Sequence, residues 1–173
     1  MLVFTGIHRV FFVGWASLLG ASTVVCAADK ASVEQTVLQQ YRQCEAGYLA
    51  KDVDAIFHSK DAGWTLTDMG TGKVTSLADN REAMADTLSK VKSLKVKIDP
   101  IVTDMLGDSF FIRYKQTHEV LFPMKDQPGT SWFIAEDTWT RRGDEWRVVS
   151  TRKLNESTSH AAHVVHVRRE LEE

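Results

Sequence analysis

The sequence has little cysteine, little proline and almost no net charge. Its 173 residues include two cysteines and three prolines, which excludes a disulfide-dense scaffold and a proline-rich disordered chain. The formal net charge of -2 gives no broad basic field, so nucleic acid is not expected as a partner. Hydrophobic residues make up 43% and charged residues 25% of the chain, which is typical of one globular domain at this length.

The N-terminal segment has the pattern of a secretory signal peptide. It contains one strong base, Arg9, then apolar or small residues over 10–25, and no acid before Asp29. We expect residues 1–27 to be cleaved, leaving no stable membrane span and a periplasmic or secreted protein. The alternative is an uncleaved membrane anchor, which the small residues in the stretch disfavour. Cleavage would leave Cys44 as the single cysteine, so no internal disulfide is expected.

Hydrophobic periodicity predicts an α+β domain over residues 28–155. Steps of three and four predict a helix capped by Ser32, a short helix capped by Asp52 and a third helix from near Asp79. Alternation predicts strands over residues 64–68, 94–98, 110–120, 131–141 and 145–154. About three N-terminal helices packed on a curved antiparallel sheet would form a cone whose cavity can hold a small ligand. Residues 156–173 are expected to be a polar tail.

The last two predicted strands define the expected polar site. A type II′ turn at residues 143–144, followed by regular pairing, places Asp137 opposite Ser150 and Ala135 opposite Arg152. Asp137 and Arg152 would then be diagonal neighbours on the inward, apolar face. A buried charge is tolerable only when it is paired. Two interpretations stay open: a structural ion pair that closes the cone, or a polar anchor inside a ligand pocket.

The strand over residues 110–120 gives a second indication. Its apolar face becomes polar at Gln116 and His118, either because the strand reaches the cavity mouth or because it leaves the core. His118 and Asp68 are the candidates for moving a proton, and the alternative for His118 is a packing role. The residues expected to bind a ligand are Asp137, Arg152, His118, Trp139, Trp64 and Tyr41. No cofactor motif and no metal site is expected.

Several short motifs occur in a recognisable order. They are DVDAIF at residues 52–57, NREA at 80–83, DTWTRR at 137–142 and WRVV at 146–149. With them, residues 33–154 resemble the nuclear transport factor 2-like superfamily, in its SnoaL-like and ketosteroid-isomerase-like branch. The resemblance implies a cone of curved sheet on three helices, commonly dimeric through the outer sheet face. It does not settle function, because such cavities host isomerases, cyclases, dehydratases and binding modules.

The steroid isomerases of this superfamily combine a carboxylate base, a tyrosine and a protonated aspartic acid. By resemblance, the aspartic acid falls on Asp137, the tyrosine position on Cys44, and the base near Leu66 or Asp68. A neighbouring Arg152 would keep Asp137 ionised and unable to donate a hydrogen bond. The resemblance therefore does not imply steroid-type isomerisation for this chain.

Three functions stay open. The first is an exported protein that binds a small, partly apolar ligand in the cone. The second is an enzyme of the cyclase, dehydratase or isomerase type. The third is a non-catalytic interaction module that uses the outer sheet face, with Glu136, Thr138, Thr151 and Lys153. The expected partners are a small molecule and a second copy of the chain, as a homodimer.

Overall fold

The computed structural model describes residues 29–160 and 163–165, so the predicted signal peptide lies outside the described residues. The elements in chain order are α1 (Lys30–Ala50), α2 (Val53–Phe57), β1 (Lys60–Asp68), β2 (Val74–Ser76), α3 (Leu77–Lys90), β3 (Ser93–Leu106), β4 (Ser109–Leu121), β5 (Gly129–Arg142), β6 (Glu145–His160) and β7 (His163–Val165). Within these residues, none of the helices is both long enough and apolar enough to span a bilayer.

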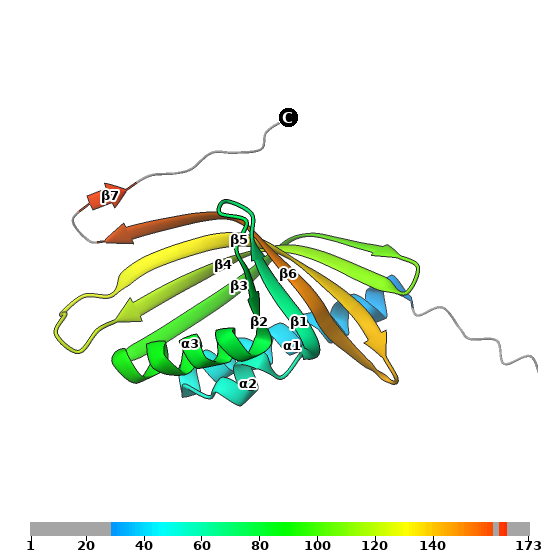
Figure 1. Ribbon diagram of the computed structural model, residues 1–173, viewed down its shortest axis with the longest axis horizontal. Helices are drawn as coiled ribbons and strands as arrows, with labels where there is room; N and C mark the ends of the chain where they lie inside the picture. Colours follow the sequence, from blue (N-terminus) through cyan, green and yellow to red (C-terminus); the bar gives the residue numbers. More distant parts are fainter. Residues whose placement is uncertain (1–28, 161–162, 166–173) are drawn as a thin grey trace, which may run out of the picture.

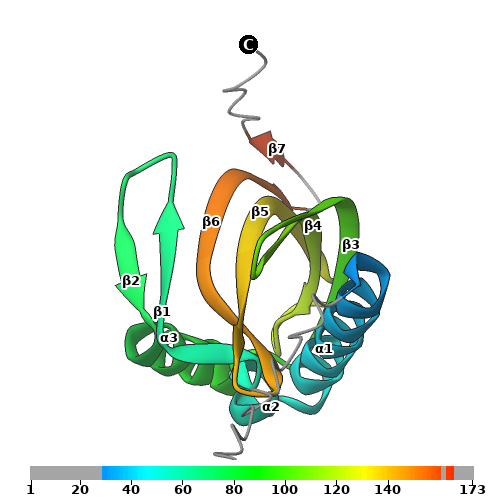
Figure 2. The same cartoon turned by 90° about the vertical axis from the view of Figure 1, so that its right-hand side faces the viewer.

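One sheet holds the strands in the order β2-β1-β6-β5-β4-β3, with β7 paired to β6. Every pair is antiparallel except β1 with β6, a parallel pair that the sequence did not predict. The sheet arches over the three helices, which lie together on its concave side (Figure 1; Figure 2). The predicted α+β cone is therefore confirmed. Strand β6 runs on to His160, into the segment expected to be a polar tail.

Side-chain hydrogen bonds cap the N-termini of two of the three helices. The predicted Ser32 cap is wrong, because α1 already begins at Lys30 and its N-cap makes no side-chain bond. Asp52 does cap α2, since its side chain accepts from the Ala55 amide. Helix α3 begins earlier than expected, because Ser76 caps it in a capping box with Asp79.

The core lies between the concave side of the sheet and helix α1. The helix contributes one apolar stripe, and strands β4, β5 and β6 contribute the residues that alternation points inward. The largest fully buried side chains are Trp139, Phe110, Ile112, Val33, Val37, Val148 and Asp137. Asp137 is the one charged residue in this group, so the surroundings of its carboxylate are the key to the site.

A β-bulge in the hairpin of β5 and β6 changes the predicted register. Residues 139–142 pair with residues 145–148 as expected from the turn. Val149 is then an extra residue on β6, because Trp139 pairs with Val148 and the preceding residue of β5, Thr138, pairs with Ser150. A bulge sets two residues against one and inverts the side-chain parity beyond it. The predicted pairing of Asp137 with Ser150 is therefore wrong, and Asp137 pairs with Thr151.

The same bulge removes Arg152 from the interior. Arg152 pairs with Glu136 rather than Ala135, and its side chain is 53% exposed. Its guanidinium lies 3.3 Å from the Glu136 carboxylate on the outer side of the sheet. The expected inward Asp137–Arg152 ion pair is therefore wrong.

Candidate functional site

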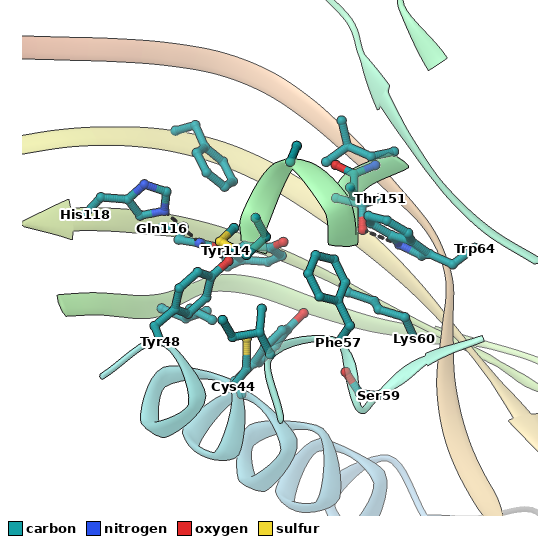
Figure 3. Close-up of a pocket in the computed structure, with 18 of the residues that line it drawn as sticks. Cys44, Tyr48, Phe57, Ser59, Lys60, Trp64, Tyr114, Gln116, His118 and Thr151 are labelled. Carbon is teal, nitrogen blue, oxygen red and sulfur yellow. Dashed lines mark hydrogen bonds between the residues drawn. The ribbon is translucent and has the colours of Figure 1, made fainter. Parts of the chain in front are cut away.

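A pocket of about 230 Å³ lies between the concave side of the sheet and the helices. All three helices, the segment leading from α2 through β1, and strands β3 to β6 contribute to its wall. Figure 3 shows the arrangement around helix α1. Its lining residues are Tyr41, Cys44, Tyr48, Ile56, Phe57, Ser59, Lys60, Trp64, Leu66, Asn80, Ala83, Met84, Thr87, Ile98, Tyr114, Gln116, His118, Phe133 and Thr151. Most of this wall is apolar or aromatic.

Behind the wall, the Asp137 carboxylate is 0% exposed and fully hydrogen-bonded. Its Oδ2 accepts from the Tyr41 hydroxyl at 3.0 Å and from the Lys60 ammonium at 3.3 Å. Its Oδ1 accepts from the Tyr114 hydroxyl at 3.3 Å and from the Thr151 hydroxyl. Four donors from α1, β1, β4 and β6 thus converge on one carboxylate of β5. This satisfies the buried charge and joins five elements of the fold.

Two tryptophans form a further layer of this network. The Trp139 indole donates to the Tyr41 hydroxyl at 3.3 Å, and the Trp64 indole donates to the Thr151 hydroxyl at 2.8 Å. Both hydroxyls are thereby oriented to donate onward to Asp137. Burial, followed by the negative charge of Asp137, raises the pKa of Tyr41 well above its usual value. The Tyr41 phenol therefore stays protonated and acts as a donor.

Lys60 joins this network to the pocket. Its side chain is 13% exposed, and its ammonium lies 5.0 Å from the centre of the Trp64 ring. Of the three ammonium protons, the Asp137 bond uses one. Lys60 thus presents a hydrogen-bond donor to the pocket while the buried carboxylate balances its charge.

A second polar group lies at the His118 end of the pocket. The Gln116 amide nitrogen is 2.7 Å from Nε2 of His118 and 3.4 Å from the Tyr48 hydroxyl. The His118 ring packs edge-on against Phe133, with centroids 5.4 Å apart. Burial lowers the pKa of His118, and the negative charge of Glu156 raises it by a smaller amount. The imidazole is therefore neutral near pH 7 and accepts at Nε2 from the Gln116 amide.

Cys44 and Tyr48 line the pocket as protonated groups. Burial raises the pKa of the Cys44 thiol to about 11, despite the nearby positive charge of Lys60. Burial also raises the pKa of Tyr48. Neither group is activated as a nucleophile at neutral pH, because nucleophilic attack by cysteine needs the thiolate.

The structure separates the residues predicted for the site into three groups. Tyr41, Trp64 and His118 line the pocket. Asp137 and Trp139 are buried behind the wall and reach the pocket only through the residues that they contact. Arg152, as described above, lies on the outer side of the sheet.

Asp68 lies outside the pocket, at the C-terminal end of β1. Its carboxylate is 2.7 Å from the Lys153 ammonium and accepts from the amides of Gly70 and Thr71. The Lys153 hydrogen bond lowers the pKa of Asp68. A general base near neutral pH needs a raised pKa rather than a lowered one, so this carboxylate is a turn and strand contact.

Sequence reasoning did not identify Lys60 and Tyr48 as site residues, and its placement of Thr151 on the outer sheet face is wrong, because Thr151 is buried and lines the pocket. The sequence gives no clear signal for Lys60, because the residue precedes the predicted strand over 64–68 and the pairing of β1 with β6 is irregular between Lys60 and Thr65. The signal for Thr151 was hidden, because only the bulge gives it the inward parity. Among the described residues, there is no group of three metal-ligating side chains that could hold a metal ion.

No family model matches this chain, and no curated protein sequence matches it. Solved structures do resemble it. A conserved protein from Planctomyces limnophilus has a TM-score of 0.67 at 9% identity, over 75% of this chain and 99% of that one. A nuclear transport factor 2-like protein from Salmonella enterica has a TM-score of 0.62 at 12% identity, over 79% and 97%. A hexachlorocyclohexane dehydrochlorinase, LinA type 2, has a TM-score of 0.60 at 8% identity, over 79% and 95%.

These identities are too low to transfer an activity, and they bear on the fold. The likeness covers most of each neighbour. The chain therefore has the nuclear transport factor 2-like fold that its sequence motifs predicted.

Proposed function

We propose that this protein binds a small, largely apolar molecule in the cone pocket, with Lys60 as its polar anchor. The observation that carries this proposal is the placement of a single ammonium in a wall that is otherwise neutral. Among the described lining residues, Lys60 is the only one with a permanent charge. An apolar pocket with few convergent polar groups is the usual form of a small-molecule site.

The chemistry of the wall supports binding more than catalysis. No carboxylate is among the described residues that line the pocket. Proton transfer would thus rest on His118. The lowered pKa of this residue keeps its imidazole neutral, and this is the observation that favours the second candidate, an isomerase- or dehydratase-type enzyme. Its Nε2, however, already accepts from Gln116 at 2.7 Å. A base whose lone pair is occupied is poorly placed to take a substrate proton.

A pair of alanines on α3 offers a direct test of the pocket. Both side chains are exposed, but only Ala83 lines the pocket. We expect Ala83→Trp to obstruct the open side of the pocket and abolish binding of neutral aromatic fragments, detected by saturation-transfer NMR. The matched Ala85→Trp variant should bind as the wild type does. Equal binding by both variants would rule out the pocket as the site.

A pair of lysines tests the anchor. Lys60→Met keeps the length of the side chain and removes the donor, and Lys95→Met makes the same change at an exposed position. Native mass spectrometry of protein purified from its own host should show a retained ligand in wild type and in Lys95→Met. We expect loss of that ligand in Lys60→Met. Undiminished retention in Lys60→Met would remove Lys60 from the site.

We also propose that the protein is exported. The composition of residues 1–27 supports this, since one base precedes an apolar stretch that ends in small residues. The mature N-terminus can be read by mass spectrometry of the protein from its own host. A start at or near Ala28 is expected, and an intact Met1 would contradict cleavage.

We further propose a homodimer formed through the outer side of the sheet. A hollow of about 170 Å³ there is bordered by the exposed apolar side chains of Val102 and Phe111, together with charged residues that include Arg113, Glu136 and Arg152. Exposed apolar residues gathered on one surface are typical of an interface. Light scattering after size exclusion should give twice the monomer mass for wild type and the monomer mass for Phe111→Asp. A monomeric wild type at micromolar concentration would contradict the proposal.

A further inference from the structure

The pocket has two polar ends of different chemistry. Lys60 and Thr151 lie at one end and His118 and Gln116 at the other, with Phe57 drawn between them (Figure 3). Most of the other lining residues are apolar or aromatic. A ligand that satisfies both ends must therefore carry two polar groups on one apolar body.

The Lys60 end suits a neutral acceptor. Its ammonium uses one proton on Asp137 at 3.3 Å and has further protons to donate. The positive charge is already balanced by that buried carboxylate. A ligand anion would place a second negative charge close to Asp137, where desolvation makes the repulsion strong. A carbonyl oxygen accepts from Lys60 without this penalty.

The opposite end suits a hydroxyl group. The Gln116 amide nitrogen donates both to His118 and to the Tyr48 hydroxyl. Within the described part of the chain, the Tyr48 hydroxyl donates to no other group, and the Gln116 amide oxygen accepts from none. Both side chains are over nine-tenths buried and line the pocket. A ligand hydroxyl can accept from Tyr48 and donate to the Gln116 oxygen.

The volume limits the size of the body. An apolar cavity of about 150 Å³ holds benzene. A pocket of about 230 Å³ therefore suits about ten heavy atoms by the same proportion. Resting on the proposed function, we propose that the preferred ligand is a neutral, single-ring molecule with a carbonyl at one end and a hydroxyl at the other.

Four probes of similar size test this proposal on the wild-type protein. They are 4-hydroxyacetophenone with both groups, acetophenone without the hydroxyl, 4-ethylphenol without the carbonyl, and anionic 4-hydroxybenzoate. Ligand-observed NMR titration should rank 4-hydroxyacetophenone tightest, with each of the others weaker by about tenfold. Equal affinities, or tighter binding of 4-hydroxybenzoate, would overturn the two-ended preference and leave the proposed function intact. Failure of all four to bind would overturn both.

Variants at the hydroxyl end test the assignment of residues. In Gln116→Leu and Tyr48→Phe, acetophenone should bind as in wild type, and 4-hydroxyacetophenone should lose its advantage of about tenfold. Thr117→Leu is the matched control, because Thr117 follows Gln116 on β4 and faces the other side of the sheet. A retained hydroxyl preference in both pocket variants would remove this end from the proposal.

Discussion

Two adjacent carboxylates on β5 lie in opposite environments. Asp137 faces inward, is fully buried and accepts from four donors on four other elements. Glu136 faces outward, is partly exposed and contacts Arg113 and Arg152. Asp137 has four partner residues and Glu136 has two, and only the outer carboxylate is reached by solvent. Because water screens the outer cluster and not the inner one, we expect the inner carboxylate to dominate stability.

The largest effect should follow from Asp137→Ala. This change leaves the Lys60 ammonium buried without its partner and leaves three hydroxyl donors without their acceptor. Breaking one side of a buried pair costs about 3–5 kcal/mol. The free energy of unfolding, measured by urea denaturation, should fall by this amount. Glu136→Ala is the matched change one residue away and should cost no more than about 1 kcal/mol.

A double variant can sharpen this first prediction. If the loss in Asp137→Ala comes from the stranded ammonium, then Asp137→Ala with Lys60→Met should be more stable than Asp137→Ala alone. If the double variant is instead less stable than the single one, Lys60 stabilises the fold even without Asp137, and the stranded ammonium is not the source of the loss. The loss would then come from the three hydroxyl donors that lack an acceptor.

A second, smaller effect is expected at the bulge. Thr151 accepts from the Trp64 indole and donates to Asp137, whereas the preceding Ser150 has the opposite parity and is only partly buried. Thr151→Val keeps the shape and removes both bonds, which costs about 2 kcal/mol when partners stay buried. Ser150→Ala should change the unfolding free energy by less than about 0.5 kcal/mol. Similar losses at both positions would contradict the bulged register.

A third effect is a change of stability with pH that comes from the buried His118. Burial lowers the folded-state pKa of His118 from its ordinary value of 6.5. The unfolded chain therefore takes up this proton first as the pH falls, so His118 reduces stability as the pH drops through 6.5 towards the folded pKa. The urea midpoint should fall less between pH 7 and pH 5.5 in His118→Phe than in wild type. An equal fall of the midpoint in His118→Phe and in wild type would contradict this prediction.

The sequence predicted most of the fold because regular periodicity carries it. The stripe of α1 contains the buried residues Val33, Val37 and Tyr41 at helical spacing. The motif over residues 137–142 and its partner over 146–149 identified the closing hairpin. These features depend on the spacing of apolar residues along the chain, and a single sequence displays that spacing directly.

The site was harder to predict, because it depends on one extra residue. With regular pairing, the apolar parity of residues 133–139 continues on β6 to Arg152. The bulge at Val149 exchanges this parity and brings Thr151 inward instead. A two-residue turn fixes only the register next to it, and neither composition nor alternation marks a bulge without glycine. Lys60 was missed because it lies before residues 64–68, the part of β1 that alternation predicts.

The smallest effect should be that of Arg152→Ala, and it tests the comparison from the outer side. The Arg152 guanidinium is 53% exposed, and its partner Glu136 keeps a second arginine, Arg113. The unfolding free energy should therefore change by less than about 0.5 kcal/mol. Binding of 4-hydroxyacetophenone should also be unchanged, because no part of the pocket wall comes from Arg152. If Arg152→Ala abolishes binding while Thr151→Val does not, β6 pairs without its bulge and the regular register is the correct one.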